Sequence, residues 1–471
     1  MNLIKKITKE NILSLFVIIC PILDISSFLF RNRFNTSISI STFIRPIIPV
    51  IVFLHIFFKE QNKNKLKFFI FGLIYFVYGI VHLYIYNTMK KDCSFGSLLH
   101  EGQYIINYSF MIMNLFIFSY TFNNTKKLQN SILISLSIYI ISIYIAIITK
   151  TSSTTYIEGI GFKGWFESGN SISSILVLSI FIIMSFILNI KNKKLKIYTF
   201  VILTLSGIYL TTLIGTRVGL VGFILAIFLF ICAEFFCNII KKQKINKKSL
   251  IALICILILI FIIVAIMGSI TMQRRKHLRE MESTIIDNSN GEISNLTGDL
   301  TTIRNKIIKN DLEEDYMTDE QKQSILDLYN IAKKHNISNT DTRMQQLIYN
   351  CALVKNQKNI ILILFGNGYL INTNELVLEM EFPAFLLNFG LIGFYLYMIP
   401  FIIIFIKAFI IMIKNLRKID TSFIMLFLGA GLSFVLSTLS GYTFFNSSSM
   451  IIIIVINVLL KAKIKQIEEV N

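Results

Sequence analysis

The sequence has little charge: Asp, Glu, Lys and Arg together make up 15% of its 471 residues, whereas soluble domains carry about 25%. Its six cysteines include no CxxC pair, and its five histidines include no HExxH pair. The low content of charged residues excludes a soluble enzyme, and the cysteine spacing excludes a secreted disulfide scaffold. We therefore expect neither a metal centre nor a cofactor.

Long apolar blocks are abundant instead: 54% of the residues are hydrophobic, and they occur in runs long enough to cross a hydrocarbon layer. Only a helix can satisfy its own backbone within lipid. The sequence therefore predicts an all-α polytopic membrane protein with about twelve spans. The predicted spans are Asn11–Phe30, Ile38–Phe58, Phe68–Thr88, Gly102–Phe122, Ser131–Thr149, Ser171–Ile190, Ile197–Ile214, Val218–Cys237, Ser249–Met267, Ala384–Ile413, Ser422–Ser440 and Phe444–Leu460.

The basic residues explain the net charge of +19 without nucleic-acid binding, because they cluster in alternate connections between the blocks. The ends of the chain and the connections on one side carry twenty-four Lys and Arg residues, and the short connections on the other side carry seven. Cytoplasmic segments carry the excess of positive charge. We expect a multi-pass protein of the cytoplasmic (inner) membrane with both termini in the cytoplasm and the lipid bilayer as a partner.

The connection between the ninth and tenth spans is large and polar, and the alternation places it outside the cell. It divides the chain into residues 1–269, 270–382 and 383–471. Between Ile270 and Lys358 it holds thirteen basic and thirteen acidic residues. A capping box of Thr318 and Gln321 predicts one helix in it, and the apolar spacing from Met344 to Cys351 predicts a second, capped by Thr340 or Thr342.

Three charged residues near the outer side are candidates for a functional site. Asp24 and Arg45 lie inside predicted spans, where an ionisable group is costly; they either pair with each other or bind a ligand. Arg217 follows Gly215 and Thr216 in a short outer connection. Its guanidinium either binds a phosphate through two parallel hydrogen bonds or extends to the membrane interface.

Two carboxylates, Glu379 and Glu381, lie where the outer loop re-enters the bilayer. A raised pKa at that boundary suits a general base, although two solvated acids would look the same in sequence. Before the sixth span, Trp165 is either an interfacial anchor or a sugar-stacking face, and Asn170 either a helix cap or a sugar contact. Arg343 opens the second loop helix.

At these residues the chain resembles the O-antigen ligase and polysaccharide polymerase family. The resemblance lies in an outer Gly-Thr-Arg at a helix start, followed by a long outer loop before the last spans. That family has a His, then Asn, Ser or Gln, nine residues, Gly, two residues and Gly. Here Glu379 and Met380 precede nine residues, then Gly390, two more and Gly393, so the spacing matches while glutamate replaces the histidine. The Glu379–Phe394 stretch is most similar to Gram-positive capsule or exopolysaccharide polymerases.

The resemblance implies a metal-independent glycosyltransferase that polymerises or ligates polyprenyl-pyrophosphate-linked glycan units at the outer membrane face. It assigns Arg217 and Arg343 to the donor's pyrophosphate, and the base to Glu379 or Glu381. From the residues themselves we expect Asp24, Arg45, Trp165 and Asn170 to be further substrate contacts. The partners implied are the glycan donor, a glycan acceptor, and flippase and chain-length-control proteins. A flippase or transporter of the same lipid-linked unit is the alternative, although such proteins usually show an internal repeat. A transferase that uses a monosaccharide-phosphate lipid would have an acidic pair in the first outer loop, which this chain lacks.

Overall fold

The computed structural model describes residues 8–36, 39–59, 65–89, 95–122, 125–156, 159–242, 247–288, 300–312, 317–337, 341–368, 376–439, 441 and 443–469. Almost all regular structure in these residues is helical. A short antiparallel pair, β1 (Ser153–Thr154) and β2 (Phe162–Gly164), precedes α6.

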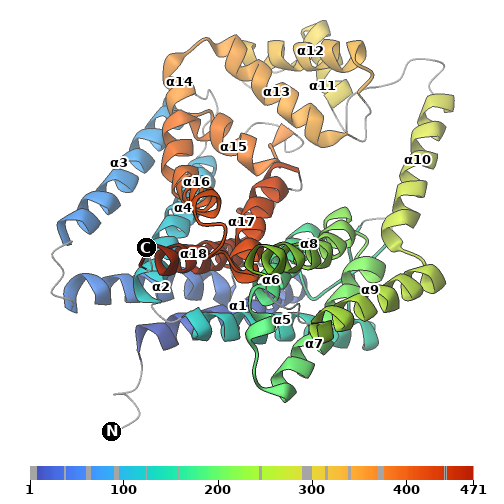
Figure 1. Cartoon of the computed structure of the whole chain (residues 1–471). Coiled ribbons are helices and arrows are strands. Elements are labelled where there is room, and N and C mark those ends of the chain that lie inside the picture. Colours follow the sequence, from blue (N-terminus) through green and yellow to red (C-terminus); the bar gives the residue numbers. More distant parts are fainter. Residues whose placement is uncertain are drawn as a thin grey trace.

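The helices of the bundle come from both ends of the chain (Figure 1). In chain order they are α1 (Lys9–Phe34), α2 (Ile40–Lys59), α3 (Lys65–Met89), α4 (Phe95–Thr121), α5 (Thr125–Ile148), α6 (Gly169–Phe186) with the short turn η2 (Ile187–Asn189), α7 (Lys193–Ile208) with the π-helical segment η3 (Tyr209–Leu213), α8 (Arg217–Lys241), α9 (Lys247–Met267), α15 (Glu381–Asn388), α16 (Gly390–Lys414), α17 (Thr421–Leu439) and α18 (Ser447–Glu469).

Eleven helices within the described residues are long and apolar enough to cross a membrane, and each overlaps one predicted span. The all-α polytopic fold is thus confirmed. The predicted span Gly102–Phe122 is also helical, as part of α4, but it is not among the eleven. Its sequence includes Asn107 and Asn114 and directly follows Glu101; Glu101 and Asn114 are buried in the bundle.

The predicted span Ala384–Ile413 is wrong in one respect, because it is two helices, α15 and α16, separated at Phe389. Gly390 has φ of +69°, a conformation that side chains with a Cβ disfavour. The backbone of Gly366 and Leu364 lies so close that a Cβ on Gly390 would be 2.5 Å from it. The chain therefore turns at this glycine and α16 begins there.

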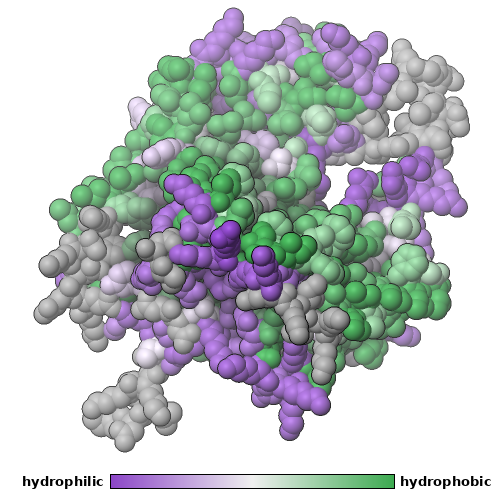
Figure 2. Space-filling view, in the orientation of Figure 1, coloured by the Kyte–Doolittle hydropathy of each residue, from purple (hydrophilic) through white to green (hydrophobic). Residues whose placement is uncertain are grey.

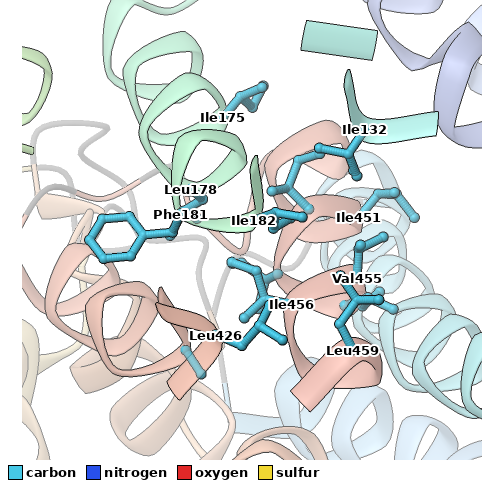
Figure 3. Packing of buried hydrophobic residues seen from close by; sticks show 14 of the residues in the cluster. Ile132, Ile175, Leu178, Phe181, Ile182, Leu426, Ile451, Val455, Ile456 and Leu459 are labelled. Carbon is cyan, nitrogen blue, oxygen red and sulfur yellow. The ribbon is translucent and has the colours of Figure 1, made fainter. Parts of the chain in front are cut away.

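The centre of the bundle is formed by α6 and α18, which pack against α5 and α17 (Figure 3). In α6, 94% of the apolar stretch is buried, and in α18 78%, whereas α9 at the edge has 22%. Ile182, Leu426, Ile456 and their neighbours fill the space between these helices (Figure 3). The close packing of α6 and α18 holds the first turns of these two helices in place, and those turns form part of the site described below.

Three loop helices, α11 (Leu300–Lys309), α12 (Asp319–Lys334) and α13 (Thr342–Gln357), form a small layer above one end of the bundle (Figure 1). Of the other two, α10 (Ile270–Asn288) stands to one side and contacts η3, and α14 (Ile360–Phe365) packs against α3 and α16. Leu300, Ile325, Leu328 and Tyr349 are buried in a separate apolar cluster of this layer. Figure 2 shows hydrophilic side chains gathered over it and hydrophobic ones over the flanks of the bundle.

Both helices predicted in the loop are present. The capping box of Thr318 and Gln321 at the start of α12 is confirmed, with both reciprocal hydrogen bonds formed. The cap predicted for α13 is wrong: Asp341, whose side chain accepts a hydrogen bond from the amide of Met344, is the N-cap, and Thr342 is the first helical residue. Thr340 lies outside the described residues.

Candidate functional site

A cavity of about 440 Å³ lies at the end of the bundle that faces the loop helices, here called the loop end. Its walls are the last turns of α1, the first turns of α2 and α6, part of α4, and the turn before α18. The same turn follows Leu439, whose carbonyl accepts a hydrogen bond of 2.8 Å from Arg343 of α13. The loop layer and the cavity are therefore on one face of the molecule.

Asp24 and Arg45 meet in the cavity wall and form an ion pair between α1 and α2. The two nitrogens at the end of the guanidinium also donate to the hydroxyls of Ser447 (2.6 Å) and Ser448 (3.0 Å) at the start of α18. Tyr139 of α5 donates to the other oxygen of Asp24 at 2.5 Å. The network pairs both charges and joins four helices, although the Nε of Arg45 has no hydrogen-bond partner.

A second ion pair stands in the wall of this cavity. Arg31, at the end of α1, lies 3.2 Å from Glu167, just before α6. Both arginines that line the cavity are thus paired with a carboxylate. The cavity wall contributes almost no net charge.

Arg217 is the first residue of α8 and its side chain is exposed at the loop end. The turn that presents it is fixed from behind: Thr216 caps α8 by accepting from the amide of Gly219 at 3.1 Å, and its hydroxyl lies 2.6 Å from that of Ser173 in α6. Gly215 has φ of +83°, so the chain turns sharply before the cap. The sequence thus places a cation at a helix start.

Tyr156 lies between the turn that precedes Arg217 and a further arginine, Arg274. The guanidinium of Arg274, in the first turns of α10, lies 3.4 Å from the centre of the Tyr156 ring, and the phenol donates to the carbonyl of Gly215 at 3.2 Å. Burial raises the pKa of Tyr156, while the positive charges of Arg274, Arg217 and Arg343 act in the opposite direction. Arg217, Arg274 and Arg343, here called the arginine cluster, are thus near enough for their charges to act on one side chain.

Arg343 and Glu379 form an ion pair at the boundary between the loop layer and the bundle. The Nε of Arg343 lies 3.2 Å from the carboxylate of Glu379, and each side chain keeps about a third of its surface exposed, 35% and 33%. The amide of Glu379 donates to Gln346 of α13 at 3.1 Å, which holds the backbone in place. The Glu379 carboxylate is thus fixed beside the arginine cluster and still reaches solvent.

Glu381 has a different environment although it is two residues away. It is fully buried, and its two oxygens accept hydrogen bonds of 2.7 Å each from the backbone amides of Phe444 and Phe445. Burial raises its pKa to about 8, against the opposing effect of these amides. The carboxyl therefore holds the turn that lines the cavity, from behind the cavity wall.

Trp165 and Asn170 stand apart from these groups. The indole nitrogen of Trp165 donates to the hydroxyl of Thr151 at 2.9 Å, beside the β1–β2 pair. Asn170 is the second residue of α6, whereas the side chain that caps this helix is Ser168, so the interpretation of Asn170 as the cap is wrong. Neither residue lines the cavity.

The structure thus brings the sequence-predicted residues into two groups on either side of the start of α6. Asp24 and Arg45 line the cavity. Arg217 and Arg343 belong to the arginine cluster, and Glu379 is the ion-pair partner of Arg343. The start of α6 packs closely against the turns beside the arginine cluster, since a Cβ on Gly169 would lie 2.4 Å from Thr155 and 3.6 Å from Thr216.

Sequence reasoning missed Arg274, Tyr156 and Tyr139. Arg274 is one of many cations in the loop, and nothing near it in the sequence sets it apart. Its position directly after the ninth span, at the membrane surface, was the available signal. Within the described residues, no group of three or more His, Cys, Asp or Glu is placed to hold a metal ion.

The helices and their polar loop end define a polytopic membrane protein with a cavity of almost no net charge and a cationic surface on the same face. Residues 6–467, nearly the entire chain, match the family of O-antigen ligase like membrane proteins, and the chain belongs to this family. No curated protein and no solved structure matched it. The family supports a membrane enzyme that polymerises or ligates glycan units in cell-surface polysaccharide synthesis.

Proposed function

We propose that the protein is a glycosyltransferase that joins polyprenyl-pyrophosphate-linked glycan units at the outer face of the cytoplasmic membrane. The observation that carries the proposal is the arginine cluster: Arg274 stacks on Tyr156, whose phenol donates to the carbonyl of Gly215 just before Arg217, and the charges of Arg217 and Arg343 also act on this phenol.

The arginine cluster suits a diphosphate for a physical reason. A guanidinium stays charged at cellular pH and offers paired N–H donors to phosphate oxygens. Glu379 is the carboxylate in direct contact with Arg343, so three positive charges face one negative charge among these four residues. Negative charge that develops on a leaving diphosphate is stabilised by such fixed cations, and we propose that the reaction proceeds without a metal ion.

The transfer step needs a group that accepts a proton. In the proposed reaction an acceptor hydroxyl oxygen attacks the anomeric carbon of the donor, and the bond from that carbon to the diphosphate oxygen breaks. The hydroxyl proton goes to the carboxylate of Glu379, and polyprenyl diphosphate leaves within the arginine cluster. Arg343 holds the carboxylate in position for this role through their ion pair.

Glu379 is favoured over Glu381 as the base because of access. Glu381 has both oxygens occupied by backbone amides and is shielded from solvent. A general base must come within hydrogen-bond reach of the proton that it removes. We therefore propose Glu381 as a positioning residue for the turn before α18.

The test is Arg217→Ala in cells, with analysis of the polysaccharide and of the lipid carrier. We expect long polymer to disappear and single lipid-linked units to accumulate on the outer leaflet, at unchanged protein abundance. Arg275→Ala is the matched control, because it removes an exposed arginine on the same helix as Arg274 that is not part of the arginine cluster. Long polymer in the Arg217 variant contradicts the proposal, and single units on the inner leaflet indicate a flippase instead.

A further inference from the structure

The cavity at the loop end is polar in chemistry although it lies among membrane-spanning helices. Four amide side chains, Gln103, Asn107, Asn114 and Asn446, line it together with the hydroxyls of Ser27, Ser39, Ser41, Thr42, Ser168, Ser171 and Ser447. Burying so many polar groups in a helical bundle is costly unless they have partners. The rings of Phe110, Phe166, Phe444 and Phe445 complete the wall.

Several of these polar atoms have no partner within the protein. The side-chain oxygen of Asn114, the hydroxyl of Ser171 and the Nε of Arg45 are all buried without a hydrogen bond. Asn114 is 3% exposed and Ser171 4%, and both line the cavity. These unpaired acceptors and donors are available to a ligand, and a ligand hydroxyl group can both donate and accept a hydrogen bond.

The charges of the cavity favour an uncharged ligand over a phosphate. Arg45 is paired with Asp24 and Arg31 with Glu167, so the wall is close to neutral. This distinguishes the cavity from the arginine cluster, in which cations outnumber carboxylates. Amides and hydroxyls around flat aromatic faces fit an uncharged ring with many hydroxyls, and a volume of about 440 Å³ fits a small ligand or the end of a longer one.

We infer that this cavity binds the uncharged terminal sugar of the acceptor glycan. The inference rests on the proposed function and divides the site in two: the arginine cluster binds the donor's diphosphate, and the cavity binds the acceptor's end. The turn Thr443–Asn446 connects the two parts. Phe444, Phe445 and Asn446 line the cavity, and Gly441 packs so closely against Glu379 that a Cβ on this glycine would lie 2.6 Å from the carbonyl oxygen of Glu379.

The chain offers a matched pair of asparagines for the test. Asn114 donates to the carbonyl four residues earlier, Phe110, at 2.9 Å, and its oxygen has no partner. Asn457 in α18 does the same with Ile453, at 2.9 Å, and its oxygen also lacks a partner, but it does not line the cavity. The two side chains differ in their access to a ligand.

The experiment measures two dissociation constants by calorimetry on the purified full chain in phosphatidylglycerol nanodiscs. The probes are the repeat-unit oligosaccharide released from its lipid, and farnesyl diphosphate. We expect Asn114→Leu to weaken oligosaccharide binding at least tenfold and to leave farnesyl diphosphate binding within twofold of wild type. Asn457→Leu should change neither, and Arg217→Ala should weaken only the diphosphate. Ser171→Ala, a smaller change, repeats the test if Asn114→Leu does not fold.

Unchanged oligosaccharide binding in both Asn114→Leu and Ser171→Ala would overturn the inference, whatever the diphosphate data show. Unchanged farnesyl diphosphate binding in Arg217→Ala would instead count against the proposed function. A neutral glycolipid headgroup has the same chemistry as the acceptor's sugar. If adding diglycosyl diacylglycerol to the nanodiscs abolishes oligosaccharide binding, the cavity belongs to that lipid and the assignment to the acceptor is wrong.

Discussion

Access to solvent separates Glu379 from Glu381, although one residue stands between them. Met380 is the N-cap position of α15, so the chain changes direction there: Glu379 remains beside Arg343, and Glu381 enters the bundle. Desolvation disfavours the charged form of a carboxyl. The buried residue thus carries the raised pKa, while the exposed one is paired with a cation.

The raised pKa of Glu381 predicts a pH dependence of stability. Its pKa is about 8 in the folded protein against an ordinary value of 4.5, so the folded state binds this proton more tightly than the unfolded chain. The stabilising contribution is complete below about pH 4.5 and is lost as the pH rises to about 8. Thermal unfolding of the purified protein should therefore show a midpoint that falls between about pH 5 and about pH 8.

Glu381→Gln removes the titrating group, so its midpoint should depend less on pH across this range, even if the variant is less stable overall. Glu379→Gln is the control and should keep the wild-type slope. Parallel curves for wild type and Glu381→Gln would show that this carboxyl does not titrate in that window.

The residues of the site were predictable from the sequence where the signal is local. A charge inside an apolar block marked Asp24 and Arg45, and their ion pair is present. The contacts of Glu381 with the amides of Phe444 and Phe445 join positions more than sixty residues apart, and no local pattern indicates them. Its side chain and that of Glu379 therefore looked equivalent in sequence.

At the scale of elements, Gly390 and Gly393, the two glycines whose spacing matches the family motif, have different physical roles. Gly390 allows the positive φ that ends α15 and begins α16. Gly393 leaves room for Tyr78 of α3, since a Cβ there would lie 2.3 Å from the phenol oxygen, which donates to the carbonyl of Phe389 at 2.7 Å. The two glycines thus allow a break between α15 and α16 and a close contact between α16 and α3 next to the site.

Gly390→Ala should destabilise the protein. A left-handed conformation costs a residue with a Cβ about 1–2 kcal/mol, and the added carbon would lie 2.5 Å from the carbonyl oxygen of Leu364. We expect a lower unfolding midpoint and lower abundance in the membrane. Gly72→Ala in α3 is the matched control, because no atom lies within 4 Å of its added Cβ, and it should cause no loss. Equal midpoints for the two variants would contradict this account.

Elements were predictable where hydropathy changes along the chain, and eleven predicted spans overlap apolar helices for that reason. The stretch Ala384–Ile413 is apolar throughout, so its hydropathy gave no sign of the break at Phe389. The cap of α13 was predicted to be a threonine, but Asp341 between the two candidates is the cap, an error of one residue.

For the whole molecule, the proposed function requires the loop layer to face away from the cytoplasm. Cys351 lies in α13 and is exposed, so it can report the side of the membrane. In a variant whose other five cysteines are serine, a membrane-impermeant maleimide should label Cys351 in intact cells. The same background with Cys351→Ser and Lys418→Cys should be labelled only after the cells are permeabilised.

Labelling of Cys351 only in permeabilised cells would place the loop layer and the arginine cluster on the cytoplasmic side. A glycan already exported to the outer leaflet would then be out of reach, and the proposed function would fail together with the predicted topology.

The helix α18 comes after all of its neighbours in chain order, yet it contacts α1, α4, α5, α6, α16 and α17. During synthesis these earlier helices enter the membrane without the element that fills the space between them. The serines that bond Arg45 are delivered with the same late helix. Assembly of the cavity wall is therefore coupled to translation of the last helix of the bundle, and a nascent chain interrupted before Ser447 would leave Arg45 without its two serine acceptors.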